Sequence, residues 1–335
     1  AAVVELVRVL GWVGDDGIHE APLPSIDDLA RFHDRRYLAA LERAGSSVLA
    51  TADDRVRFNL GTMECPVFEG LWERARASVG GSILAATLAM RDGGVGYHPA
   101  GGTHHGRREK ASGFCYLNDP VFAILTLLDA GAGRVAYVDL DAHHGDGVEL
   151  AFADDPRVSM ISLHEADRWP GSGPTGTSAG GRIVNVMLPR RFGDARYRML
   201  AEAVLFPALE RWRPDAVVVT LGADTLAGDP LSSVGLFNHT LWDLTERIIA
   251  GVPVAVVLGG GGYNPWTAAR LWAGLWGRLT GVVFPDPLPA VAQDILGRLD
   301  SDLVDEDDRL PHWTTTLADP AVVDDLVSNR QNKRK

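Results

Sequence analysis

The segment RVAYVDLDAHHGDGVE, residues 134–149, places acidic residues and histidines at the end of a short apolar run. In an extended chain alternate side chains share one face, about 6–7 Å apart, so Asp139, Asp141 and His143 project the same way. Carboxylates and imidazoles are ligands for Zn²⁺, and a cation would offset the several kcal/mol that an unpaired buried charge costs. We therefore predict a metal site here. The alternative is a strand end whose aspartates cap a turn and whose histidines are exposed.

Other apolar runs also lead into polar side chains. VSMISL is followed by His164, AVVVTLGA by Asp224, and PVAVVLGGGG by Tyr263. Ligands of open α/β sheets bind outside the carboxyl ends of the strands, so these groups are expected to meet at one edge. Two carboxylates and one imidazole leave a position open for water, as in a catalytic zinc site. Asp224 is therefore the predicted third ligand, although an isolated Gly-Ala-Asp-Thr would indicate only a turn.

A glycine-rich loop, AGGTHHGRREKASGFCYLND, supplies two further imidazoles, His104 and His105. Spare carboxylates at Asp139 and Asp146 suggest that each histidine is oriented by an aspartate and works as acid or base beside the metal. The alternative is a pair of histidines exposed on a surface loop.

Four consecutive glycines, residues 259–262, precede Tyr263. They lack the G-x-G-x-x-G spacing and the Lys-Ser/Thr of a P-loop, which disfavours a nucleotide site. One interpretation is that the glycines position the phenol of Tyr263 as a donor to a developing oxyanion. A simple turn between a strand and a helix is the other.

The elements around these motifs predict an α/β fold. Continuous runs of Val, Ile and Leu separated by helices are typical of a parallel sheet covered on both faces. We predict a single three-layer domain, with a central, mostly parallel sheet flanked by helices. The expected strands are residues 135–140, 158–163, 183–188, 216–221 and 253–258, and the expected helices include residues 66–91, 120–131, 195–212, 237–250 and 265–279. Residues 1–61 are expected to be mostly helical, with Ser25 as an N-cap, and residues 96–118 to be a loop.

Composition limits the classes of function. The 335 residues carry a formal net charge of −12, which disfavours a nucleic-acid-binding surface and weakly favours a cationic ligand. Two cysteines give no disulfide framework, so we expect a cytoplasmic location. No apolar run approaches the roughly 18 residues of a membrane span, and no signal peptide opens the chain. Residues 300–309 are acidic, and the basic tail 329–335 is expected to be disordered.

Together the motifs resemble those of the zinc-dependent histone deacetylase superfamily, most closely its bacterial acetoin-utilisation branch. AGGTHHGRREKASGFCYLND, VAYVDLDAHHGDGVELAF, ISLHE, VVTLGADTLAGDPL and VLGGGGYNPWTAARLW match the signature blocks in order, over about residues 20–280. The resemblance implies an arginase/deacetylase-like fold, with a catalytic domain at 1–320 and a tail at 321–335. The family's N-terminal strand has no counterpart before Ala1.

The resemblance also assigns roles to the residues of the metal and acid-base site. It implies one zinc ion held by Asp141, His143 and Asp224. It pairs Asp139 with His104 and Asp146 with His105, and it makes Tyr263 the group that polarises the acetyl carbonyl.

The same resemblance implies a substrate tunnel and a second cation. Gly113 and Phe114 would line the tunnel opposite Trp169, which stands where the family usually has Phe or Tyr. Leu231 would lie near its mouth, and Glu64 would hold the substrate backbone. A structural K⁺ or Na⁺ is expected at backbone oxygens of Asp139, Asp141 and His143, together with Ser162 and Leu163.

These expectations predict a zinc-dependent hydrolase that removes acetyl from N-ε-acetyl-lysine in proteins or peptides and releases acetate. An acetylpolyamine amidohydrolase, acting on a small acetylated amine, is the first alternative. A catalytically inactive acyl-lysine-binding module and an arginase-like binuclear manganese hydrolase are the others. Neither a nucleic-acid nor a membrane partner is expected, and the oligomeric state stays open.

Overall fold

The computed structural model describes residues 2–320, which form seven strands in one sheet. The strand order is β1-β7-β6-β2-β3-β5-β4, and all neighbours are parallel except β4, which runs antiparallel to β5. The five predicted strands and the mostly parallel sheet are confirmed. The strands are β1 (Gly94–His98), β2 (Val135–Asp139), β3 (Val158–Glu165), β4 (Gly176–Ser178), β5 (Ile183–Leu188), β6 (Ala216–Thr220) and β7 (Val254–Leu258).

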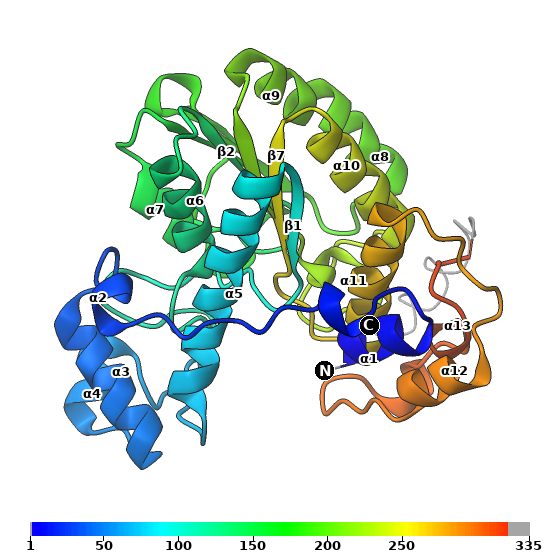
Figure 1. The fold of residues 1–335 in the computed structure, drawn as a ribbon, viewed down its shortest axis with the longest axis horizontal. Helices are drawn as coiled ribbons and strands as arrows, with labels where there is room; N and C mark the ends of the chain where they lie inside the picture. Colours follow the sequence, from blue (N-terminus) through cyan, green and yellow to red (C-terminus); the bar gives the residue numbers. More distant parts are fainter. Residues whose placement is uncertain (1, 321–335) are drawn as a thin grey trace.

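Helices cover both faces of this sheet, as Figure 1 shows. They are α1 (Ala2–Val9), α2 (Ile26–Leu29), α3 (Arg35–Ser47), α4 (Ala52–Phe58), α5 (Leu71–Asp92), α6 (Asp119–Asp129), α7 (Asp146–Phe152), α8 (Asp194–Leu200), α9 (Phe206–Trp212), α10 (Asn238–Ala250), α11 (Pro265–Leu279), α12 (Ala290–Gly297) and α13 (His312–Thr315).

The alternation of side chains along each strand builds two cores. Val135 and Tyr137 of β2 pack in a cluster with α3, α5 and α6, whereas Ala136 and Val138 pack in a second cluster with α8 to α11. Successive strand residues point to opposite faces, so each continuous apolar run contributes side chains to both cores. The predicted three-layer architecture is therefore confirmed.

Two helices beside the site, α6 and α11, each begin at an asparagine that caps the first turn. The Asn118 side chain accepts the N–H of Val121 at the start of α6, with Pro120 in the first turn. Asn264 does the same for Trp266 and Thr267 at the start of α11. Asparagine at such a position satisfies N–H groups that have no partner within the helix. Both loops are thus fixed directly beside the functional residues.

The sequence-based boundaries were wrong at three places. The helix predicted from residue 66 begins only at Leu71, after Gly70 in a left-handed conformation. Residues 94–98 form β1, although most of them fell within a predicted loop, because Gly-Val-Gly-Tyr-His contains no apolar run and pairs only at the sheet edge, with β7. The predicted helix 195–212 is divided by a π-helical turn, Ala201–Leu205, between α8 and α9. The hydrophobic pattern of a helix does not encode such a local change of pitch.

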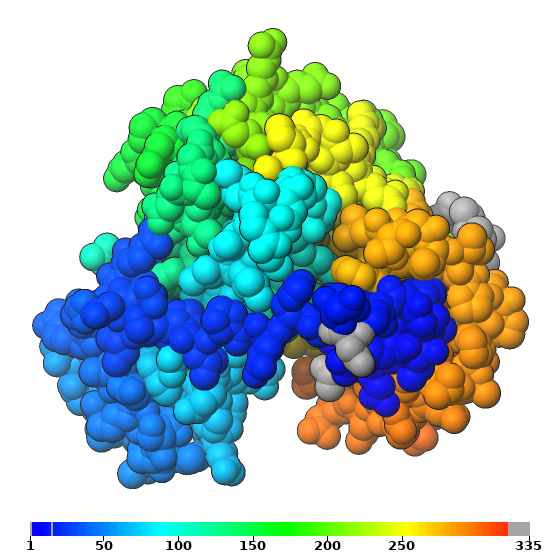
Figure 2. All heavy atoms as spheres, in the orientation of Figure 1, coloured from blue at the N-terminus to red at the C-terminus, as the bar shows by residue number. Residues whose placement is uncertain are grey.

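The N-terminal segment lies on the outside of the molecule. Helix α1 packs against α11 and α12, and the chain then crosses the surface to α2, α3 and α4, as the blue segment shows in Figures 1 and 2. Within the described residues that precede β1 there is no strand. The predicted tail 321–335, including 329–335, lies outside the described residues. In the described part of the chain no helix has the length and apolar character to cross a membrane.

Candidate metal and acid-base site

The predicted site residues gather at the carboxyl ends of neighbouring parallel strands. Asp141 and His143 lie in the turn after β2, Asp224 in the turn after β6, and Tyr263 in the loop after β7. His104 and the adjacent His105 come from the loop between β1 and α6. The ends of parallel strands share one edge, and this topology brings distant parts of the sequence together.

Asp141, His143 and Asp224 form a compact, buried group. Each offers one ligand atom, and these atoms all lie within 4.8 Å of one another. His143 Nδ1 lies 2.9 Å from Asp224 Oδ2 and 3.3 Å from Asp141 Oδ1. Among residues 2–320 this is the only group of three or more His, Cys, Asp or Glu side chains whose ligand atoms lie close enough together to hold an ion.

The electrostatics of this group suit a cation. Asp141 and Asp224 are 1% and 0% exposed, and within residues 2–320 neither forms an ion pair with a lysine or arginine. Burial, together with the nearby charge of Asp141, raises the pKa of Asp224 to about 7. Two carboxylates and an imidazole are oxygen and nitrogen donors of the kind that bind zinc, and a divalent ion would relieve the repulsion between the carboxylates. The donor set therefore fits zinc.

Backbone N–H groups hold the two carboxylates in place. Gly261 N–H donates to Asp141 Oδ2 at 2.6 Å, and Ala142 N–H donates to Asp224 Oδ1 at 2.9 Å. A Cβ at Gly261 would lie 2.3 Å from Asp224 Oδ2, so only glycine allows this approach. The glycine run thus lets the backbone approach the two carboxylates, and the N–H of Gly261 already donates to Asp141.

His104 and His105 form two histidine–aspartate pairs at the cavity floor. His104 Nδ1 lies 2.8 Å from Asp139 Oδ2, and His105 Nδ1 lies 2.9 Å from Asp146 Oδ1. The two Nε2 atoms are 2.9 Å apart. Since each Nδ1 donates to a carboxylate, the two Nε2 atoms are hydrogen-bonded to each other in this structure, and this bond has to open before either Nε2 can serve water or an amide nitrogen. The predicted pairing is present in the structure.

The two imidazoles differ in charge. Burial disfavours the charged form of His104, but Asp139 and Asp141 outweigh this effect and raise its pKa to about 9. For His105, burial and the neighbouring charge of His104 prevail over Asp146 and lower the pKa to about 4. Near neutral pH His104 is therefore protonated and His105 is neutral.

Three supporting residues were not identified from the sequence. The Tyr137 hydroxyl lies 2.9 Å from Asp139 Oδ2 and 2.8 Å from Thr220 Oγ1. Arg107 donates to the Asp146 carboxylate. The i, i+2 spacing of Tyr137 and Asp139 on one strand was a usable signal, whereas nothing in the sequence indicated the partner of Arg107.

A cavity of about 400 Å³ leads to this group. Its lining includes Glu64, His105, Phe114, Trp169, Leu231 and Tyr263. The Trp169 ring meets His105 edge-on, with centroids 4.5 Å apart. A Cβ at Gly113 would lie 2.4 Å from the Trp169 ring, so the indole packs directly on the glycine. The predicted wall residues Gly113, Phe114 and Trp169 therefore line one cavity.

Glu64 contacts the loop that contains Gly113 and Phe114. Its Oε1 accepts the Gly113 N–H at 2.6 Å, and its Oε2 accepts from Asn59 Nδ2 at 3.0 Å. In this structure the carboxylate braces Gly113 and Phe114, at whose φ angles, 54° and 62°, the backbone is left-handed.

Two of the residues expected around a monovalent cation, Ser162 and Leu163, lie on β3, the strand next to β2. Ser162 is paired in register with Asp139, and Leu163 follows it on β3. His164 Nε2 donates to the Gly173 carbonyl at 2.9 Å, so its Nδ1 accepts the Ser162 hydroxyl proton at 2.9 Å. The lone pairs of Ser162 Oγ are then left for another partner.

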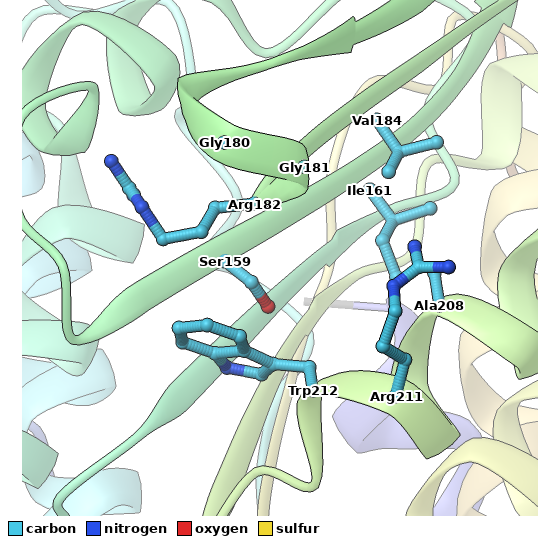
Figure 3. Close-up of a pocket in the computed structure, with 9 residues that line it drawn as sticks. All are labelled: Ser159, Ile161, Gly180, Gly181, Arg182, Val184, Ala208, Arg211 and Trp212. Carbon is cyan, nitrogen blue, oxygen red and sulfur yellow. The ribbon is translucent and has the colours of Figure 1, made fainter.

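A second cavity, of about 120 Å³, lies at the opposite end of the strands (Figure 3). Ser159 Oγ and Trp212 Nε1 are buried there without a hydrogen-bond partner among the described residues. Figure 3 shows the Ser159 hydroxyl facing the Trp212 ring, and the side chains of Arg182 and Arg211 pointing in different directions. Its polar groups do not converge, so this cavity is not a candidate catalytic site.

Comparison with known proteins agrees with the geometry. Residues 1–279 match the family model described as "Histone deacetylase domain". Histone deacetylase 8 of Xenopus tropicalis is 34% identical over 295 residues, covering 86% of this chain and 79% of that protein. Histone deacetylase RPD3 of Saccharomyces cerevisiae is 39% identical over 282 residues, covering 81% and 64%.

Solved structures show the same fold. The crystal structure of an HDAC homologue from Aquifex aeolicus has a TM-score of 0.89 and 29% sequence identity, and the match covers 99% of this chain and 92% of that one. A structure of an HDAC homologue in complex with SAHA gives the same values. The sequence match, the shared architecture and the buried Asp-His-Asp group lead to one conclusion: this chain belongs to the histone deacetylase family.

Proposed function

We propose that the chain is a zinc-dependent hydrolase that cleaves the acetyl amide of N-ε-acetyl-lysine in proteins or peptides and releases acetate. The observation that carries this proposal is the arrangement of Asp141, His143 and Asp224 beside two aspartate-bound histidines at the floor of one cavity. An amide hydrolase needs an electrophilic centre, a base and an oxyanion donor within reach of one carbonyl carbon, and this cavity contains residues suited to each role.

Asp141, His143 and Asp224 would hold the zinc ion. When bound, zinc supplies Lewis acidity toward a carbonyl oxygen and toward water. Gly261 and Ala142 hold the carboxylates in place through their N–H groups, so the ligand atoms are oriented before an ion arrives.

His105 would act as the base that takes a proton from water, since burial keeps its imidazole neutral, and it would then return the proton to the leaving amine. His104, held protonated by Asp139, would keep positive charge beside the developing negative charge. Arg107 limits the basicity of Asp146, so His105 rather than Asp146 would hold the transferred proton.

Tyr263 would donate its phenol proton to the oxyanion. Burial, reinforced by the charge of Asp224, raises the pKa of this phenol far above its usual range, so the phenol remains a donor. Its ring lies near Phe114 and His143, with centroids 6.0 and 6.4 Å apart, respectively.

The cavity wall suits an acyl-lysine chain. Phe114 and Trp169 are 50% and 43% exposed, so apolar rings reach the surface at the cavity mouth. A four-carbon lysine stem could bury its methylene groups between these rings while the peptide backbone stays outside. Leu231 would complete the wall, and Glu64, which braces Gly113, would hold the substrate backbone at the cavity rim.

Finer assignments belong to the same proposal. We propose K⁺ or Na⁺ as a structural ion at backbone oxygens of Asp139, Asp141 and His143, together with Ser162 and Leu163. Residues 1–320 would form the catalytic domain, and the acetoin-utilisation branch remains the proposed subfamily. The acetylated partner would be a protein or peptide, with a cytoplasmic location.

The test is acetate release from an acetyl-lysine peptide and from an acetylated polyamine, each with and without a hydroxamate or a chelator. We expect faster release from the peptide, and inhibition by either agent. Faster turnover of the polyamine would favour the acetylpolyamine alternative. No release from either substrate by metal-loaded protein would favour the inactive binding module.

A further inference from the structure

Asp229 is a buried carboxylate that the mechanism above does not use. The residue is 7% exposed, and within residues 2–320 it forms no ion pair. Its two oxygens accept backbone N–H groups from two different loops: Oδ1 accepts from Leu231 at 2.9 Å, and Oδ2 accepts from Tyr263 at 2.7 Å. One carboxylate thus connects the tunnel wall with the proposed oxyanion donor.

This position is costly for a negative charge. Burial raises the pKa of Asp229 to about 6, against the lowering effect of the N–H groups that it accepts. A neutral asparagine would avoid that cost, but its single carbonyl oxygen can accept only on one side, and its amide NH₂ would face the other N–H. The geometry requires two acceptors at once, which a carboxylate supplies.

Two further hydrogen bonds join the connection after β6 to the loop after β7. Asn264 Nδ2 donates to the Gly228 carbonyl at 3.0 Å, and Ala223 N–H donates to the Gly261 carbonyl at 2.6 Å. Asn264 also caps α11. The loop that carries Tyr263 is therefore held at both ends, and Asp229 holds the residue whose phenol must be placed.

We propose that Asp229 is a positioning residue that fixes the backbone of Tyr263, and through it the phenol, against the tunnel wall at Leu231. It touches neither the acetyl group nor the ion site and acts through Tyr263. This inference rests on the proposed function, because it assumes that the Tyr263 phenol contributes to turnover.

A double-mutant cycle tests the proposal. Asp229→Asn should lower kcat on an acetyl-lysine peptide about 10- to 100-fold, as expected when a reacting group is displaced by about 1 Å. KM should change less than about threefold, since the tunnel residues remain. In a Tyr263→Phe background the same change should lower the residual kcat by less than about threefold, because the group that Asp229 positions is already absent.

The outcomes distinguish failure of the Asp229 positioning role from failure of the proposed role of Tyr263. An equal loss in both backgrounds, or no loss in the wild type, would overturn the positioning role of Asp229. If Tyr263→Phe alone keeps full turnover, the proposed role of Tyr263 fails instead. Asp215→Asn is the matched control. Asp215 accepts the Arg134 N–H at 2.8 Å and so joins the amino ends of β2 and β6, far from the metal group. Its replacement should leave kcat unchanged.

A second variant covers the case in which Asp229→Asn does not fold. Replacing Tyr263 by its α-hydroxy analogue exchanges the backbone N–H for an ester oxygen and keeps the phenol. This change removes the N–H that Tyr263 donates to Asp229 and leaves the Tyr263 side chain intact, and it should lower kcat by a similar factor, with zinc content and hydroxamate affinity retained. Wild-type kcat in the ester variant would contradict the proposal.

Discussion

The two ends of the central strands bury polar groups in different ways. At the carboxyl end Asp139, Asp141 and Asp224 each accept from several donors, and they converge on one cavity. At the amino end Ser159 Oγ is buried with no partner among the described residues, beside a small cavity lined mainly by apolar groups. Burial of a polar atom is therefore not a sign of function by itself. Convergence of charged groups from several strands is the more informative feature.

The largest effect is expected from the carboxyl end. Asp224→Asn removes one ligand of the proposed metal site and should lower turnover about 10³-fold or more, because the Lewis acid supplies several kcal/mol to the transition state. Metal content should fall together with turnover. The metal-free variant should unfold at or above the melting temperature of metal-free wild type, since the repulsion between Asp224 and Asp141 is removed. An unchanged metal content would contradict this assignment.

Tyr263→Phe tests the oxyanion donor without touching a ligand. Loss of one such donor typically costs about 10²–10³ in rate, and we expect that loss in kcat. Zinc content and hydroxamate binding, measured by calorimetry, should persist, because the ligand carboxylates are held by Gly261 and Ala142. Turnover close to wild type would refute the role of Tyr263.

A buried histidine next to the site should make folding sensitive to acid. His33 Nε2 accepts the Asn118 N–H at 3.1 Å, and Nδ1 donates to the Arg107 carbonyl at 3.0 Å. Burial lowers its pKa from 6.5 to about 4. Below pH about 6.5 the unfolded chain binds a proton that the folded chain does not, so the free energy of unfolding falls, by up to roughly 1.4 kcal/mol per pH unit, until about pH 4.

The measurement is denaturant unfolding between pH 4 and 7 for wild type and His33→Gln. Glutamine can accept from Asn118 and donate to Arg107 without titrating, so its pH slope should be smaller. The other buried histidines contribute equally to both proteins. Identical slopes would show that His33 is not the titrating group.

The smallest effect is expected at the amino end of the strands. Ser159→Ala removes an unpartnered buried hydroxyl and should raise the free energy of unfolding by about 1 kcal/mol, with kcat and KM unchanged. Chemical denaturation and the acetate assay check these two expectations. A loss of activity would show that the amino-end cavity participates in function, and would remove the contrast between the two ends.

Much of the carboxyl-end arrangement could be predicted because it depends on topology. Continuous apolar runs identified β2, β6 and β7, and parallel strands bring their ends to one edge. The positions of Asp141, His143 and Asp224 directly after these strands were then enough to predict that they meet. The pairing of His104 with Asp139 came from a family resemblance, and the structure contains it.

Other features could not be read from the sequence. His33 contacts Asn118 across 85 residues, and a lone histidine in a helical region carries no signal of that contact. Asp229 resembles an ordinary turn residue until the loop of Tyr263 is placed against it. β1 forms through backbone pairing with β7 rather than through an apolar pattern. Each of these depends on partners far away in the sequence.

The central claim is that Asp141, His143 and Asp224 bind a single divalent ion. Its most direct test is the metal content of the purified chain after zinc loading and dialysis, measured by mass spectrometry for wild type and for a variant in which Asp141 and Asp224 are both replaced by Asn. We predict about one zinc ion per wild-type chain, and none retained by the variant. Two ions per wild-type chain, or zinc retained by the variant, would contradict the account.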